Sequence, residues 1–168
     1  MFGNVIGQSV VERTLHADTA VSYKLHSYSE AHIFFTHRTN ALDYDILYSH
    51  RKLISSVSKN KRNDESHFVS VKKQSDSYLI VRDGEQLCFK PDISFSSILL
   101  FYEEPKKQTE VFSERLGEYR PMKCVAPHEY EVDMKDGDTY IYRYQNGKLL
   151  ELEMKKGLLG AAFLRPKG

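Results

Sequence analysis

The sequence has no tryptophan, only two cysteines and five prolines, and no long apolar run among its 168 residues. Its longest apolar stretch, from Ile93 to Tyr102, is interrupted by serines and falls short of the ~18–20 residues that a membrane-spanning helix needs. We therefore expect no membrane span. Cys88 and Cys124 lack the spacing of a metal motif, so we also expect no metal and no cofactor.

A large charge of one sign is absent as well. Lysines and arginines number 24 and acidic residues 23, which gives a formal net charge of +1. A chain of this charge has no strong field to attract nucleic acid. The basic groups Arg51-Lys52 and Lys59–Arg62 have no aromatic residues between them for base stacking. We expect no nucleic-acid partner.

Aromatic residues and alternating patterns are abundant. Tyrosine occurs 11 times and phenylalanine nine times, which favours strands. Apolar and polar residues alternate in residues 21–26, 42–48 and 69–72, as expected of strands with one buried face. Asp83-Gly84 predicts a tight hairpin that pairs Ile80 with Leu87 and Tyr78 with Phe89.

The C-terminal third contains two more turn dipeptides, Asp136-Gly137 and Asn146-Gly147. If both turns are tight, Lys135 pairs with Asp138 and Gln145 pairs with Lys148. The register then predicts an apolar face and a face of tyrosines and acids. The apolar face contains Tyr130, Val132, Met134, Ile141, Leu150, Leu152 and Met154, and the other contains Glu129, Glu131, Asp133, Tyr140, Tyr142, Tyr144, Glu151 and Glu153. A slip of one residue in either turn would change these faces.

One segment departs from the alternation. Residues 94–104 begin with serines that can cap a helix, place apolar residues at helical spacing and end before Pro105. This pattern predicts a short amphipathic helix on the concave face of the sheet, with a strand as the alternative. The predicted fold is thus all-β with one short helix. It is an antiparallel meander of about ten strands, curled into a barrel or half-barrel, in a single domain of residues 1–168.

Several short motifs occur in an order that is familiar from a protein family. They are Glu104-Pro105, residues 111–114 (Val-Phe-Ser-Glu), residues 117–119 (Gly-Glu-Tyr) and the series of tyrosines that ends at Asn146-Gly147. From Gly7 to Leu164 the chain resembles a family of uncharacterised bacterial proteins known only as a domain of unknown function. Its ending is also similar in outline to exported half-barrels of the periplasmic lipoprotein-carrier type.

The resemblance implies export but no catalytic residues, because none is established for that family. Residues 2–7 have neither a basic segment nor a long apolar core, so we see no leader there. We expect the protein to be periplasmic or exported if a leader has been trimmed, and otherwise cytoplasmic.

The leading functional hypothesis is non-catalytic binding or carriage of an apolar or amphiphilic ligand, such as a lipid, in the concave face. Arg143 is predicted on the apolar side, where a cation could anchor an anionic head group. Residues 98–102 would form a lid over the ligand. The predicted ligand-binding residues are Arg143, Tyr130, Val132, Ile141, Leu150, Leu152, Leu99 and Tyr102.

Three alternatives stay open. Tyr140, Tyr142 and Tyr144 could form a solvent-facing sheet surface or bind a protein partner or a carbohydrate. The domain could be a structural or interaction module with a filled core, or a hydrolase with a carboxylate pair drawn from Glu103, Glu104 and Glu114 together with a histidine. The two cysteines could form a disulfide or remain as buried free thiols.

Overall fold

Two compact units make up the chain. The computed structural model describes residues 5–17, 19–33, 36–156 and 161–165. The first unit comprises Met1–Phe95 and Glu114–Gly117, and the second comprises Ser96–Ser113 and Glu118–Gly168. Each unit is dominated by strands, so the predicted all-β class is confirmed.

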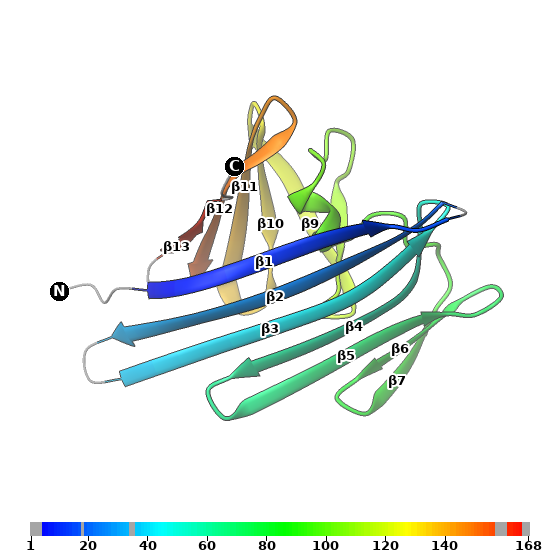
Figure 1. Cartoon of the computed structure of the whole chain (residues 1–168), viewed down its shortest axis with the longest axis horizontal. Coiled ribbons are helices and arrows are strands. Elements are labelled where there is room, and N and C mark those ends of the chain that lie inside the picture. The colour runs from blue at the N-terminus through cyan, green and yellow to red at the C-terminus, as the bar shows by residue number, and fades with distance from the viewer. Residues whose placement is uncertain (1–4, 18, 34–35, 157–160, 166–168) are drawn as a thin grey trace. The chain divides into compact units, whose positions relative to one another are not determined.

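The first unit contains a seven-stranded antiparallel sheet whose strands lie in chain order (Figure 1). Its strands are β1 (Val5–Leu15), β2 (Ala20–Ile33), β3 (Thr36–Ser49), β4 (Lys52–Arg62), β5 (Glu65–Lys73), β6 (Tyr78–Arg82) and β7 (Glu85–Phe89). Every strand pairs with the next strand along the chain, which confirms the predicted meander for this part of the protein.

One face of this sheet is buried. Tyr23 pairs with Ile46 and Leu25 pairs with Tyr44 across β2 and β3, and all four side chains are buried. The residues between them point to the opposite face, where Lys24, for example, is exposed. Because side chains alternate along a strand, burial of one set leaves the other in solvent. The apolar–polar alternation in the sequence has this origin.

The predicted hairpin at Asp83-Gly84 is confirmed. Ile80 pairs with Leu87 and Tyr78 with Phe89, and both turn residues have a positive φ, 47° at Asp83 and 93° at Gly84. The Asp83 carboxylate also accepts a hydrogen bond of 2.7 Å from the backbone N–H of Phe68 on β5. The turn is therefore held both by its own backbone geometry and by the neighbouring strand.

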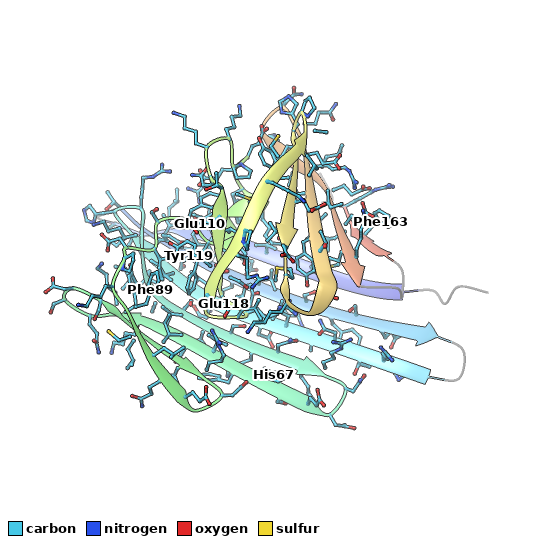
Figure 2. The ribbon with its side chains drawn as sticks, turned by 180° about the vertical axis from the view of Figure 1, so that it is seen from behind. His67, Phe89, Glu110, Glu118, Tyr119 and Phe163 are labelled. Atoms are coloured by element: carbon cyan, nitrogen blue, oxygen red, sulfur yellow. The ribbon has the colours of Figure 1, made fainter. Side chains whose placement is uncertain are left out.

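The second unit contains a six-stranded antiparallel sheet, with strands again in chain order. Its elements are the 3₁₀ turn η1 (Ser97–Phe101), β8 (Glu110–Ser113), β9 (Glu118–Ala126), β10 (Glu129–Asp133), the 3₁₀ turn η2 (Lys135–Gly137), β11 (Asp138–Gln145), β12 (Lys148–Lys156) and β13 (Ala161–Leu164). Tyr119 of β9, labelled in Figure 2, packs edge-to-face on Phe112 of β8 with ring centroids 5.5 Å apart.

The helix predicted for residues 94–104 is much shorter in the structure. Only Ser97–Phe101 is helical, and it is a 3₁₀ turn in which the backbone N–H of Tyr102 donates to the carbonyl of Leu99. Ser96 precedes it without a side-chain capping bond. Ile98, Leu99 and Leu100 are buried consecutively. The segment is buried on more than one side, which a two-turn amphipathic helix would not allow.

The predicted faces are correct for β10 and for residues 151–154 of β12, but they are wrong for Leu150 and for β11. Tyr130 and Leu152 both pair with Tyr142, so the tyrosines of β11 share the apolar face. Ile141 instead pairs with Glu131 and Glu153. The register of β11 therefore differs by one residue from the prediction in every pair with β10, and in the pairs with β12 from Asp138 to Arg143.

Two local features cause this slip. The chain from Met134 to Asp138 forms a wider connection through η2, so that Asp133 pairs with Thr139 and the predicted pair of Lys135 with Asp138 is not formed. At the other end Gln145 pairs with Lys148 as predicted, but a bulge follows, because Tyr144 pairs with Leu149 and Arg143 with Glu151. The bulge inserts Leu150, which is 53% exposed.

Both sheets are open. The first ends at β1 and β7 and the second at β13 and β8, so neither closes on itself within the described residues. The barrel or half-barrel stays a prediction. In the part of the chain that the structure describes, no helix is long and apolar enough to cross a membrane.

Candidate functional site

A groove of about 710 Å³ lies on the exposed face of the seven-stranded sheet, over β1 to β4. This volume falls within the ~300–1,000 Å³ of typical small-molecule sites. Most of the lining side chains belong to the face opposite the buried one. They are Val10, Glu12, Lys24, His26, Asp43, Asp45, Ser55, Val57 and Lys59. Leu25 of β2 and Tyr44 of β3, which lie between these residues along their own strands, also line the groove.

The strand register arranges these side chains in two neighbouring rows. The Glu12 row runs across the four strands through Glu12, Lys24, Asp45 and Val57. The His26 row runs beside it through Val10, His26, Asp43 and Lys59. Residues that pair directly across antiparallel strands lie close enough for their side chains to interact.

Acidic and basic side chains alternate along both rows. Lys24 lies between Glu12 and Asp45, and Asp43 lies between His26 and Lys59. The imidazole Nδ1 of His26 lies 2.5 Å from Oδ1 of Asp43, whose carboxylate is the acceptor. These two side chains are 69% and 51% exposed, so water screens the contact and it adds little stability. The polar groups of the groove are thus accessible to a ligand.

A second cluster surrounds Glu104 in the second unit. The side chain of Glu104 is only 4% exposed, and its Oε1 accepts hydrogen bonds of 2.9 Å from Nδ1 of His128 and from the hydroxyl of Tyr130. Its Oε2 has no hydrogen-bond partner in the structure and lies 3.8 Å from Nζ of Lys106. The contact fixes the imidazole of His128, of which 59% is exposed.

Burial and hydrogen bonding compete at this cluster. Burial raises the pKa of Glu104, but the hydrogen bonds from His128 and Tyr130 outweigh it and the pKa is lowered overall. Burial and the neighbouring Glu104 carboxylate raise the pKa of Tyr130 to about 12. Burial also raises the pKa of Tyr144, whose hydroxyl donates to the carbonyl of Leu100 at 2.7 Å. Glu104 is therefore an ionised acceptor beside two neutral phenols.

Arg143 lies at the centre of a third cluster, on the carboxylate face of the six-stranded sheet. Its guanidinium donates to Glu129 at 3.1 Å, to Glu151 at 2.9 Å and to Glu153 at 2.7 Å. The hydrogen bond to Glu153 is the largest cause of its raised pKa. Arg165 donates to the second oxygen of Glu151 at 2.7 Å. Three carboxylates thus occupy the donors of Arg143.

The predicted ligand-binding residues do not gather at the groove, because all of them belong to the second unit. Within that unit they are divided between different environments. Tyr130, Val132 and Leu152 share the buried face of the sheet, and Leu99 is buried in η1. Four others lie elsewhere: Ile141 and Arg143 on the carboxylate face, Leu150 in the exposed bulge, and Tyr102 after η1, half-buried. Their contact with a ligand stays a prediction.

The remaining predictions have mixed outcomes. Tyr142 and Tyr144 are buried, so they do not form the solvent-facing surface that was predicted for a protein partner. Cys88 and Cys124 are both free thiols, and both are exposed where burial was expected. Among the described residues no group of three or more potential ligands could hold a metal ion.

The sequence contained part of the signal for the groove. Lys24 and His26 alternate with buried residues on one strand, and Asp43 and Asp45 do so on another. This shows that four polar side chains are exposed, but not that they lie opposite one another. The rows depend on the register between β2 and β3, which pairs residues such as Lys24 with Asp45.

Comparison with known proteins gives one match. The model of a family described as a domain of unknown function (DUF6134) matches residues 1–167, so the chain belongs to this family. No match was found among the curated proteins or among the solved structures. The expected resemblance to an uncharacterised family is thus confirmed.

Proposed function

Since the family has no known function, we propose from the geometry that the protein is a non-catalytic binding module that holds an amphiphilic small molecule in the groove of its seven-stranded sheet. The observation that carries the proposal is the groove itself, a hollow of about 710 Å³ on a face that is otherwise exposed. The hollow is open to solvent on one side, so it is large enough to hold one face of a small ligand against the sheet.

The composition of the lining supports an amphiphilic ligand. Val10 and Val57 lie at opposite ends of the two rows and offer apolar surface. Lys24, Asp43 and Asp45 between them offer donors and acceptors. Small-molecule sites commonly combine apolar walls with a few polar groups that fix orientation. A purely apolar ligand would desolvate these charges without replacing their hydrogen bonds.

The first test is native mass spectrometry of protein purified from cells, before and after mild organic extraction. We expect an additional mass that disappears on extraction. The variant Val57→Trp, which fills the groove, should lose that mass. The matched control is Val81→Trp, on the same face of the sheet but outside the groove lining.

The control variant should keep the additional mass. A clean protein mass that does not change when dodecylphosphocholine, dodecyl maltoside or a tetrasaccharide is added would contradict the proposal. It would favour the alternative of a structural or interaction module. An additional mass that survives Val57→Trp but is lost in Leu152→Arg would instead place the ligand on the predicted face of the second unit, provided that the folded fraction is unchanged.

Hydrolysis is a second candidate function, favoured by the contact between Glu104 and His128. A buried carboxylate that holds one imidazole nitrogen leaves the other nitrogen to act as a base. The sequence also predicted Glu114 as a member of a hydrolytic carboxylate pair. Glu114 is buried and belongs to the first unit, whereas Glu104 belongs to the second. The variant His128→Ala separates the two functions: a hydrolase would lose turnover of ester substrates, and a binding module would keep its ligand.

A further inference from the structure

The two rows of the groove contain almost balanced charges, and this restricts the ligand. Three carboxylates (Glu12, Asp43 and Asp45) face two lysines (Lys24 and Lys59), and each carboxylate has a basic side chain opposite it on a neighbouring strand. A strongly anionic or cationic ligand would gain attraction from one member of each pair and repulsion from the other. The rows therefore favour a ligand without net charge.

The same rows alternate hydrogen-bond donors with acceptors. The ammonium of Lys24 donates and the carboxylate of Asp45 accepts, and neighbouring strands lie about 4.8 Å apart. A hydroxyl group both donates and accepts, so a polyhydroxylated ligand can bond to both kinds of partner. The exposure of His26 and Asp43 leaves their polar atoms accessible for such bonds.

Exposed aromatic rings lie beside the rows on the same face. Tyr28 follows His26 by two residues along β2 and is 43% exposed. Phe68 pairs with Lys59 from β5 and is 41% exposed. Three strand spacings, roughly 14 Å, and an offset of two residues along the strands separate the two positions, which therefore lie roughly 16 Å apart. Flat aromatic surfaces at this separation can cover the C–H faces of rings at both ends of a short chain.

We propose that the ligand of the groove is a neutral sugar, bound as a short chain of pyranose rings between Tyr28 and Phe68 with its hydroxyls on the Glu12 and His26 rows. A pyranose matches this surface because it combines hydroxyls at its rim with C–H groups on its faces. Both a free oligosaccharide and the sugar head group of a glycolipid have this chemistry. The inference rests on the proposed binding function and specifies its ligand class.

The test is isothermal titration calorimetry of the full chain with two kinds of probe. Cellotetraose and maltotetraose represent free sugars. Dodecyl maltoside and dodecylphosphocholine, both used below their micellar concentrations, have the same alkyl chain, and only the first has a sugar head group. We expect binding of at least one tetrasaccharide or of dodecyl maltoside, and at least tenfold weaker binding of dodecylphosphocholine. Binding of a tetrasaccharide would identify a free oligosaccharide as the ligand. Binding of dodecyl maltoside alone would identify the sugar head group of a glycolipid.

Variants connect the binding to the groove. Tyr28→Ala and Phe68→Ala should each weaken sugar binding about tenfold, since each removes a stacking ring. Phe163→Ala, at a 58% exposed ring of β13 in the second unit, is the control and should leave the affinity unchanged. Because the ligand is neutral, Kd should change less than twofold between 50 mM and 500 mM NaCl.

Each contrary result has a distinct meaning. Equal binding of both detergents, lost in Val57→Trp, would overturn the sugar inference and keep the proposed amphiphile-binding function. Sugar binding that is unaffected by Tyr28→Ala and Phe68→Ala would overturn the inferred position of the sugar. Absence of binding by all four probes, together with a clean native mass, would overturn both the sugar inference and the proposed function.

Discussion

The groove and the Arg143 cluster both place opposite charges on one face of an antiparallel sheet, but they differ in burial. In the groove His26 and Asp43 are 69% and 51% exposed. In the cluster around Arg143 the side chains of Glu151 and Glu153 are 14% and 11% exposed, and those of Arg143 and Glu129 are 29% and 28% exposed, so the network is partly buried. A buried ion pair is costly to break, whereas an exposed one exchanges readily with water.

This difference decides which cluster suits a ligand. An anionic head group that approached Arg143 would have to displace three carboxylates that are already hydrogen-bonded to it. A ligand at the groove replaces water around Lys24 and competes at Asp43 with the exposed contact from His26. The partly buried network is therefore suited to holding β10, β11 and β12 together, and the exposed rows are suited to recognition.

The largest expected effect is that of Arg143→Met. This substitution keeps an apolar stem but leaves three carboxylates close together without their common cation, so we expect the free energy of unfolding to fall by about 3 kcal/mol at pH 7. Urea denaturation monitored by circular dichroism measures it. Arg165→Met is the control, because Arg165 is 76% exposed and should contribute less than about 1 kcal/mol. Equal losses of unfolding free energy in Arg143→Met and Arg165→Met would contradict the distinction between the more buried and the more exposed charges.

Glu104→Gln should have the next largest effect, about 2 kcal/mol at pH 7, because it removes a charged acceptor that two donors share. Burial opposes the ionised form of Glu104, but the hydrogen bonds of His128 and Tyr130 keep its pKa below the unfolded value of about 4.3. Ionised Glu104 therefore stabilises the fold above that pH, and this stabilisation is lost as the pH falls through the folded pKa.

Urea denaturation between pH 7 and pH 3 tests this pH dependence. The unsubstituted protein should lose stability on acidification more steeply than Glu104→Gln, so the two curves should converge at low pH. The control Glu103→Gln removes the neighbouring carboxylate and leaves the contacts of Glu104 with His128 and Tyr130 in place. Parallel curves for the protein and Glu104→Gln would show that Glu104 does not titrate differently in the folded state.

Local sequence patterns predicted much of the fold. The Asp83-Gly84 hairpin is correct because its register depends on two turn residues and the five-residue strands on either side. The faces of β10 and of residues 151–154 in β12 are correct because both segments alternate strongly between acidic and apolar residues. Patterns of this kind act within a few residues and can be read from one segment at a time.

Long-range contacts account for what could not be predicted. Arg120 of β9 donates to the carbonyls of Asp133 and Met134, at 2.8 and 2.9 Å, and so holds the connection that displaces the register of β11. No pattern within residues 133–139 reveals an arginine from another strand. The groove could not be predicted for the same reason, because its two rows depend on the mutual register of four strands.

Tyr144→Phe extends the comparison to a single hydroxyl. The hydroxyl of Tyr144 donates to the buried carbonyl of Leu100, so its removal should cost about 1–2 kcal/mol and loosen η1. The matched control is Tyr28→Phe, whose exposed hydroxyl donates to Glu30 at 3.3 Å and should contribute less than about 0.5 kcal/mol. Urea denaturation and hydrogen exchange at the amide of Tyr102 measure the two effects. If Tyr28→Phe lowered the free energy of unfolding as much as Tyr144→Phe, burial would not decide the strength of the two hydroxyl hydrogen bonds.

Asp43→Asn should have the smallest effect on stability and a clear effect on binding. The contact of Asp43 with His26 is exposed, so its loss should change the free energy of unfolding by less than about 0.5 kcal/mol. The carboxamide replaces one acceptor oxygen by a donor in the middle of the His26 row, where Asp43 lies between His26 and Lys59. Calorimetry with the tetrasaccharide that binds best should then show about tenfold weaker binding, since a charge-assisted hydrogen bond contributes about 1.5 kcal/mol or more. Unchanged affinity together with a large loss of stability would mean that the Glu12 and His26 rows stabilise the fold, as the Arg143 cluster does, and do not bind a ligand.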